Sequence, residues 1–215
     1  MSLESVTERA LAALSTAGRS VESLTILAVS KGHSTGEIAA LYDRGHHDFG
    51  ENRAQELRDK VPELPDDIRW HFVGPLQSNK ARIVRPAVVA LHSMDRLSLA
   101  SAWMKGSGRP PACYLQVNIG REDQKSGVLP VDAAATADRL TEMGVPIIGL
   151  MAIPPLADDP EQSRPHFAAL RELRDDLSAD HPGIAGLSMG MSNDFEVAIA
   201  EGATVIRVGR AIFQD

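Results

Sequence analysis

Short apolar runs alternate with amphipathic segments from one end of the chain to the other. The apolar runs have the length and the flanking turn residues of buried β-strands. Eight strands are predicted, at residues about 24–30, 47–49, 70–73, 87–93, 112–118, 146–151, 185–189 and 204–208. A helix or helical turn is predicted after each strand, and a further amphipathic helix precedes the first strand at residues about 4–17. Strict alternation of this kind favours a parallel sheet.

The number of strand–helix units narrows the fold. Eight units in 215 residues match a compact (β/α)8 barrel. An open doubly wound sheet would carry Gly-x-Gly-x-x-Gly after its first strand, or a phosphate loop ending in Gly-Lys-Ser/Thr, and neither motif is present. No Pro- or Gly-rich linker divides the chain. We therefore predict an α/β fold, a single-domain TIM-type barrel over residues 1–215 with an extra N-terminal helix.

Local signals predict where several helices begin. Ser34 and Glu37 have the spacing of a capping box. Asp95 and Ser192 are predicted N-caps of the helices after the fourth and seventh strands. Proline is favoured at the first helical position, so Asp159-Pro160 is predicted to open the helix before the seventh strand.

Polar and glycine-rich segments follow six of the eight predicted strands. In a barrel of this kind the working residues lie at the C-terminal ends of the strands, which meet at one face. The segments are Lys31, Gly50-Glu51-Asn52, Gly74 to Lys80, Asn118, Met189 to Asp194, and Arg207 with Gly209-Arg210. We expect a functional site where they converge.

Lys31 and Arg207 are predicted to face the same pocket. Lys31 ends a run that is predicted to be fully buried, where a lysine loses its proton more easily and becomes a nucleophile for aldehydes. Strand alternation places Val205, Arg207 and Gly209 on the inner face of the last strand. A buried arginine needs acceptors, which either a ligand or a neighbouring acid would supply. The alternative for Lys31 is a surface ammonium at a strand end.

An anion site is predicted between the last two strand ends. Gly190 permits a close backbone approach, and Ser192 offers a hydroxyl at a predicted helix start. Gly209 leads into a predicted helical turn over residues 210–212. Two helix N-termini directed at one place attract a phosphate. The alternative is that both glycines are only tight turns and Ser192 only a cap.

A phosphorylated aldehyde would satisfy these elements together. Its aldehyde would join Lys31, its phosphate would bind the glycine-rich turns, and a ring nitrogen would accept a hydrogen bond from Arg207. Pyridoxal 5′-phosphate is such a ligand. A sugar phosphate bound by a cofactor-free Schiff-base aldolase would satisfy only the first two elements.

Composition excludes several classes of function. The net charge of −7 argues against a nucleic-acid partner, and no apolar stretch approaches the length of a membrane span. The single cysteine, Cys113, permits no internal disulfide and is expected to be a buried, inert thiol. The seven scattered histidines do not predict a metal site. Together with the lack of a signal peptide in the sequence given, these features predict a cytoplasmic location.

Seven segments, in order along nearly the whole chain, resemble those of the pyridoxal phosphate homeostasis protein family. They are Leu27 to Lys31, Phe49 to Asn52, Trp70 to Lys80, Gln116 to Asn118, Gly149 to Met151, Leu187 to Ser192, and Arg207 to Gly209. The resemblance implies a barrel related to the N-terminal domain of alanine racemase. It also implies a role in carrying the cofactor inside the cell, with most members having no established turnover.

The resemblance implies a role for seven residues. Lys31 would form an aldimine with pyridoxal 5′-phosphate, and Arg207 would contact its ring nitrogen. Ser192 and the backbone of Gly209 and Arg210 would contact the phosphate, and two further residues near the site would be Asn52 and Met191. In two positions the chain departs from many members of the family: Arg53 replaces a tyrosine and Arg210 replaces a threonine.

Three functions remain open at this stage. The resemblance agrees with a cofactor carrier. Its partners would be apo-enzymes that need pyridoxal 5′-phosphate, and it would be a monomer or a weak dimer. A racemase would need an acid/base group on each face of its substrate. Only residues 210–215 follow the last predicted strand to supply a second one, unless a partner protomer does. A Schiff-base aldolase would lack the yellow colour of a bound aldimine.

Overall fold

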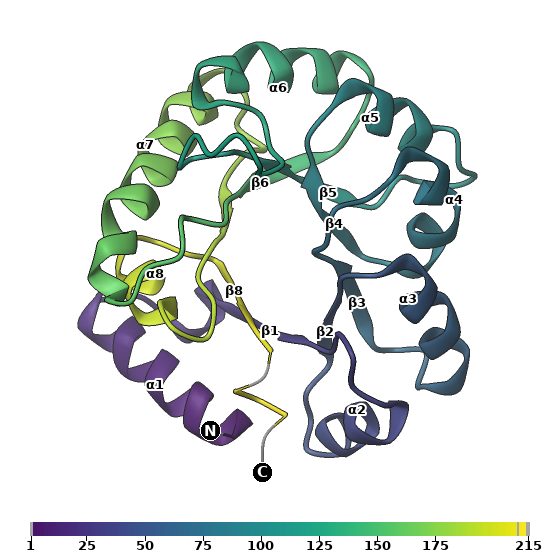
Figure 1. Ribbon diagram of the computed structural model, residues 1–215, viewed down its shortest axis with the longest axis vertical. Helices are drawn as coiled ribbons and strands as arrows, with labels where there is room; N and C mark the ends of the chain where they lie inside the picture. The colour runs from purple at the N-terminus through teal and green to yellow at the C-terminus, as the bar shows by residue number, and fades with distance from the viewer. Residues whose placement is uncertain (1, 210, 214–215) are drawn as a thin grey trace.

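Eight parallel strands form a closed barrel that is surrounded by helices (Figure 1). The computed structural model describes residues 2–209 and 211–213. The strands follow one another around the barrel in chain order, and the last strand pairs with the first to close it, with Thr25 opposite Val205 and Ala28 opposite Val208. The predicted (β/α)8 architecture is confirmed.

The strands are short and lie close to their predicted positions. They are β1 (Thr25–Val29), β2 (Asp48–Glu51), β3 (Arg69–Phe72), β4 (Ala90–Met94), β5 (Ala112–Gln116), β6 (Ile147–Met151), β7 (Gly186–Ser188) and β8 (Val205–Val208). The largest difference is at β4, which was expected from about residue 87. A 3-10 turn occupies Arg85–Ala87, and Pro86 within it has no N–H to give to a strand ladder.

Helices follow the strands around the outside of the barrel. They are α1 (Leu3–Thr16), α2 (Thr35–Tyr42), α3 (Ala54–Lys60), α4 (Ala81–Val84), α5 (Leu97–Met104), α6 (Ala133–Glu142), α7 (Arg164–Asp180) and α8 (Phe195–Ala200). The helix expected from about residue 51 begins at Ala54, because Glu51 still belongs to β2.

The extra N-terminal helix is confirmed as α1, which packs against α8 (Figure 1). Its buried residues recur at helical spacing: Leu3, Val6, Ala10 and Leu14. Arg9 adds an ion pair with Glu196 of α8, at 2.5 Å. The first helix is therefore fixed to the outer layer by one apolar stripe and by at least one charged contact.

Two of the predicted helix starts are confirmed. The Ser34 hydroxyl accepts from the backbone N–H of Glu37, and the Glu37 carboxylate accepts from the backbone N–H of Ser34, so the capping box is complete. Asp159 accepts from the backbone N–H of Glu161 at the start of the 3-10 turn that leads into α7.

The other two predicted caps are wrong. The helix α5 begins after Arg96, and the Asp95 carboxylate accepts from the Arg96 guanidinium instead of from the helix backbone. The helix α8 begins after Asp194, two residues later than Ser192 would place it. A sequence with several polar residues before a helix does not say which of them occupies the capping position.

Buried apolar residues form two clusters, one inside the barrel and one in the layer between the strands and the helices. The smaller cluster contains Leu27, Val73, Ala90, Tyr114, Met151 and Val205. Ile206 and Val208 belong to the larger cluster, which includes the buried faces of the helices. Since alternate residues of a strand face opposite sides, Arg207 shares the inner face with Val205, as predicted.

Candidate functional site

A cavity of about 670 Å³ opens at the C-terminal ends of the strands, where barrels of this type bind their ligands. Six of the seven predicted site residues line it: Lys31, Asn52, Met191, Ser192, Arg207 and Gly209. The seventh, Arg210, lies outside the described residues. The cavity therefore brings together residues from the ends of β1, β2, β7 and β8.

Lys31 lies two residues beyond the end of β1 and is exposed. The expectation of a buried lysine is wrong, because Ser30 and Lys31 have already left the strand and the chain turns outward there. β1 itself is fully buried only at Leu27 and Ala28. The Lys31 ammonium group makes no hydrogen bond or ion pair with the described part of the chain, so its amine is open to the cavity.

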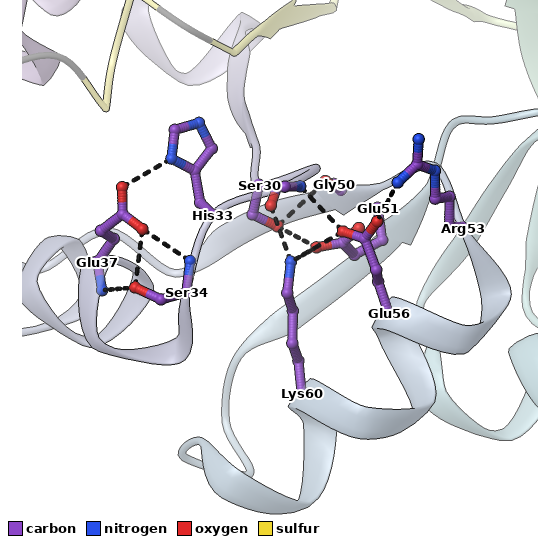
Figure 2. A network of polar contacts seen from close by, with 10 residues as sticks. Ser30, His33, Ser34, Glu37, Gly50, Glu51, Arg53, Glu56 and Lys60 are labelled. Atoms are coloured by element: carbon purple, nitrogen blue, oxygen red, sulfur yellow. Dashed lines mark hydrogen bonds and ion pairs between the residues drawn. The ribbon is translucent and has the colours of Figure 1, made fainter.

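A polar network joins Ser30, the residue before Lys31, to Glu51, Glu56 and Lys60 (Figure 2). The carboxylate of Glu51 accepts from the Ser30 hydroxyl at 2.7 Å and from Lys60 Nζ at 2.5 Å. Lys60 Nζ also donates to the Ser30 backbone oxygen at 2.8 Å. Glu56 accepts from the Gly32 backbone N–H at 2.9 Å. The residues on both sides of Lys31 are thus held by side chains from β2 and α3.

Arg207 is buried at the bottom of the cavity, with 5% of its surface exposed. Its guanidinium donates to the Ser188 backbone oxygen and hydroxyl, at 2.6 and 2.7 Å, and to the Ala152 backbone oxygen at 2.9 Å. Burial lowers the pKa of Arg207 to about 10, and the charge of Asp194 opposes that shift. The guanidinium remains protonated at neutral pH, with no carboxylate of the described residues in an ion pair with it.

A chain of hydrogen bonds continues from Arg207 through the inside of the barrel. Ser188 Oγ lies 2.7 Å from His92 Nδ1, and His92 Nε2 lies 3.0 Å from His71 Nδ1. His71 Nε2 lies 3.7 Å from Asp48 at the opposite rim. Burial lowers the pKa of His92 well below its usual value, with the charges of His71 and Arg207 acting in the same direction. His92 is therefore a neutral imidazole with one donor and one acceptor nitrogen.

The groups at the two ends of this series have fixed roles, because a guanidinium only donates and an ionised carboxylate only accepts. Arg207 donates to Ser188 Oγ. The direction of the Ser188–His92 and His92–His71 contacts depends on the tautomers of the two imidazoles. Burial alone would raise the pKa of Asp48, but hydrogen bonds from His71 and Arg69 outweigh burial and lower it, so Asp48 is an ionised acceptor at the far end.

The segment after β7 turns sharply into α8. Gly190 has a φ of +92°, and a Cβ at this position would lie 2.6 Å from Ala198 Cβ, so only glycine fits. The buried Asp194 carboxylate accepts from the Met191 backbone N–H at 2.7 Å and from the Ser163 hydroxyl at 3.2 Å. These bonds hold the turn that presents Ser192 to the cavity.

The predicted pair of helix N-termini is not found among the described residues. Ser192 lies in the turn before α8, and residues 211 and 212 form a turn in which the Ile212 N–H donates to Gly209 O at 2.8 Å. The backbone N–H groups of Ser192 and Asn193 have no hydrogen-bond acceptor in the described ranges. Donors for an anion are therefore available at this edge of the cavity, but they come from turns.

Asn52 is positioned by a close contact between two backbones. A Cβ on Gly74 would lie 2.2 Å from the Asn52 backbone oxygen, so glycine alone permits this approach after β3. The Asn52 side-chain oxygen is buried and has no hydrogen-bond partner in the part of the chain that the structure describes. A buried acceptor without a donor indicates that a ligand or water supplies one.

The comparisons with known proteins agree with this geometry. The family described as "Alanine racemase, N-terminal domain" matches residues 9–215. A curated relative from Aquifex aeolicus, named pyridoxal phosphate homeostasis protein, is 41% identical over 98% of this chain and 95% of its own length. A relative of the same name from Escherichia coli (strain K12) is 39% identical over 98% of this chain and 94% of its own. The chain belongs to the pyridoxal phosphate homeostasis protein family.

Solved structures include a close match to this member of the pyridoxal phosphate homeostasis family. PipY from Synechococcus elongatus, determined with PLP bound, is 36% identical with a TM-score of 0.81, over 97% of this chain and 100% of PipY. Alanine racemase from Corynebacterium glutamicum is 16% identical with a TM-score of 0.73, over 98% of this chain and 61% of the racemase. The second likeness is one of fold alone.

Several cavity residues of this homeostasis-family member were not predicted from its sequence. Lys125 comes from the loop after β5, and its ammonium donates to Pro154 O at 2.8 Å and pairs with Glu122 at 2.5 Å. His33 lies at the rim of the cavity, where its ring stacks on Phe213 at 4.0 Å between centroids. Both come from loops, and no periodic pattern in the sequence predicts that these loops approach the cavity.

Asn118, expected at the site, and Arg53, one of the two departures from the family, make other contacts. Asn118 exchanges hydrogen bonds with the backbone of Glu122, at 2.8 and 3.1 Å, and so orders the loop after β5 instead of lining the cavity. Arg53 is exposed, pairs with Glu56 at 2.8 Å and lines a neighbouring groove of about 450 Å³ that it shares with Asn52.

Three further findings concern the single cysteine, metal sites and membrane-spanning helices. Burial raises the pKa of Cys113 to about 12, which agrees with a buried, inert thiol. Over residues 2–209 and 211–213, no group of three or more His, Cys, Asp or Glu side chains is arranged to hold a metal ion. No helix in the same ranges has the length and the hydropathy to cross a membrane.

Proposed function

We propose that this chain binds pyridoxal 5′-phosphate through Lys31 and serves in homeostasis of that cofactor. The observation that carries the proposal is the pairing, in one cavity, of an unengaged lysine amine with a buried arginine that has no carboxylate partner among the described residues. The PLP-bound structure of PipY and the names of the curated relatives support the choice of ligand.

The residues of the cavity fit the chemical groups of this cofactor. The amine of Lys31 suits the aldehyde, and the guanidinium of Arg207 suits a ring nitrogen that accepts a hydrogen bond. Ser192, Asn193 and Gly209 line the same cavity, and the Ser192 hydroxyl and the backbone N–H groups of Ser192 and Asn193 would supply donors for a phosphate. The unpaired side-chain oxygen of Asn52 requires a donor, and the ring hydroxyl of the cofactor is one.

Lys31 would hold the cofactor as an aldimine. The amine adds to the aldehyde carbon, a C=N bond replaces the C=O bond, and the oxygen leaves as water, so the step needs no oxidant or reductant. The bond forms and hydrolyses reversibly, which suits a protein that carries the cofactor and releases it. Apo-enzymes that require the cofactor are the recipients that this role implies.

Arg207 favours carriage over turnover. A permanently charged guanidinium that donates to the ring nitrogen disfavours a second positive charge there. An unprotonated ring is a weak electron sink for a carbanion, so the cofactor would be held in a state of low reactivity. The curated relatives are named for homeostasis and not for a reaction, which agrees with this role.

The deciding experiment is the absorbance spectrum of the purified protein with pyridoxal 5′-phosphate, before and after borohydride, followed by peptide mapping. We expect a yellow species whose reduced adduct maps to Lys31 and is lost in Lys31→Ala. Lys125→Ala is the matched control, because Lys125 lines the same cavity but has its ammonium engaged. An adduct that maps to Lys125 or Lys80 would overturn the assignment, and a colourless protein would favour a cofactor-free aldolase.

A further inference from the structure

We infer that Lys60, together with Glu51 and Glu56, is a positioning residue for Lys31. The inference rests on the proposed function, since it concerns how the Lys31 amine is presented to the aldehyde. None of the three lines the cavity that contains Lys31. They contact Ser30 and Gly32 on either side of Lys31, and Figure 2 shows Glu51, Glu56 and Lys60 gathered around Ser30.

The contacts hold the backbone on both sides of Lys31 and leave its side chain free. Ser30 is fixed at three atoms: its N–H donates to Gly50 O at 2.9 Å, its hydroxyl donates to Glu51, and its carbonyl accepts from Lys60. Gly32 is fixed at its N–H by Glu56. The position of Lys31 Cα is therefore determined by side chains of β2 and α3, while the Lys31 side chain reaches into the cavity.

Lys60 joins the pieces of this network. Its ammonium contacts the Ser30 carbonyl, Glu51 at 2.5 Å and Glu56 at 3.4 Å. One cation thus links the end of β1, the end of β2 and its own helix α3. A neutral side chain of the same length would pack in the same space but would leave the two carboxylates and the carbonyl without this common donor.

Stability alone is a weak explanation for these charges. Lys60 is 8% exposed and Glu51 is fully buried, and replacing a buried ion pair by apolar residues is often neutral or stabilising. Geometry is a better explanation, because a nucleophile must approach its target carbon in a narrow range of positions. A misplacement of about 1 Å caused by a residue remote from the chemistry can cost about 100-fold.

The test compares two ligands that differ only at the reacting carbon. Pyridoxamine 5′-phosphate has the ring and the phosphate of pyridoxal 5′-phosphate but no aldehyde, so it forms no bond to Lys31. In Lys60→Met we expect affinity for pyridoxal 5′-phosphate to fall about tenfold or more and borohydride trapping at Lys31 to slow by a similar factor. Affinity for pyridoxamine 5′-phosphate should change less than about twofold.

Two further variants make the result specific. Lys60→Arg keeps a cation at this position and should recover part of the trapping rate. Lys105→Met, an exposed lysine at the end of α5, should match the wild-type protein for both ligands. If Lys60→Met does not fold, Glu56→Ala takes its place. That change removes the hydrogen bond to Gly32, together with the pair to the exposed Arg53 and the long contact to Lys60, but it keeps Lys60 on Ser30 and Glu51. It should give the same pattern with a smaller effect.

Three outcomes would overturn the inference. One is an unchanged trapping rate in Lys60→Met, and another is an equal loss of both ligands, which would indicate general damage to the cavity. The third is a wild-type protein that binds both ligands equally and yields no adduct at Lys31. That last result would remove the proposed function as well, whereas the first two would leave the Lys31 adduct of the wild-type protein intact.

Discussion

Ser192 is the residue at which the phosphate assignment can be tested directly. Its hydroxyl lies at the cavity edge in a half-buried turn. Loss of one hydrogen bond to a charged acceptor costs about 1–3 kcal/mol. Because Ser192 is partly exposed, we expect Ser192→Ala to cost about 1 kcal/mol, which lowers the affinity for pyridoxal 5′-phosphate about fivefold. Titration with pyridoxal 5′-phosphate and with pyridoxal should show the loss only for the phosphorylated ligand. Equal affinity of the wild-type protein for both ligands would exclude a phosphate site here.

In the proposed function, Arg207 would limit the reactions of a bound cofactor. Because its guanidinium keeps the ring nitrogen unprotonated in our proposal, we expect negligible exchange of the α-proton of alanine and serine in heavy water, relative to free cofactor. The measurement is deuterium incorporation by the pure holoprotein. Exchange on the order of 1 per second that disappears in Lys31→Ala would contradict the carrier role and favour a racemase.

Sequence reasoning located Lys31 and Arg207 but not all of their surroundings. Strand alternation was enough to place Arg207 inside the barrel. Ile206 and Val208 pack against the helices, so Val205 and Arg207 face the inside. It failed on the burial of Lys31, because the exact residue at which a strand ends is the least predictable feature of an element. The contacts of Lys60 depend on the register of β1 against β2 and α3, which no local pattern encodes.

At the scale of elements, the capping box of α2 makes the stability of the fold depend on pH. Hydrogen bonds from His33 and from Ser34 lower the pKa of Glu37 to about 2. A carboxyl whose pKa is lower in the folded state than in the unfolded state stabilises the fold above its unfolded pKa, about 4.3. That contribution to stability is lost as the pH falls through the pKa that Glu37 has in the folded state.

We therefore expect the free energy of unfolding to decrease as the pH is lowered from about 5 toward 2. Glu37→Gln should decrease stability at pH 7 and flatten part of this dependence. Urea unfolding followed by circular dichroism at several pH values measures both effects. A Glu37→Gln curve parallel to that of the wild-type protein throughout would show that the capping box of α2 does not contribute.

The order and type of the elements were predictable, while some of their ends were not. Each strand and helix was visible as an apolar run or a helical period because both faces of a barrel strand are buried. The late starts of β4 and α8 follow from the 3-10 turn at Arg85–Ala87 and from the bonds of Asp194 to Met191 and Ser163. Contacts of this kind form only when distant segments meet.

For the whole molecule, Ser188 joins the cavity to the centre of the barrel. Its buried hydroxyl accepts from Arg207 and shares a hydrogen bond with His92 Nδ1. Ser188→Ala should lower the free energy of unfolding by about 1–3 kcal/mol, because it leaves the buried His92 Nδ1 without its hydrogen-bond partner. Ser101→Ala, an exposed serine of α5, should change stability by less than about 0.5 kcal/mol. Chemical denaturation of both variants is the measurement, and equal midpoints would contradict a role for this bond.

The line of polar groups from Arg207 to Asp48 also connects the two rims of the barrel. Arg207 at the cavity can only donate and the ionised Asp48 at the other rim can only accept, while Ser188 and the two imidazoles between them can each do both. The tautomer of each imidazole therefore depends on groups at both rims. Asp48→Asn, which removes the charge beside His71, would reach the hydrogen bonds around Arg207 from the side of the barrel opposite the cavity.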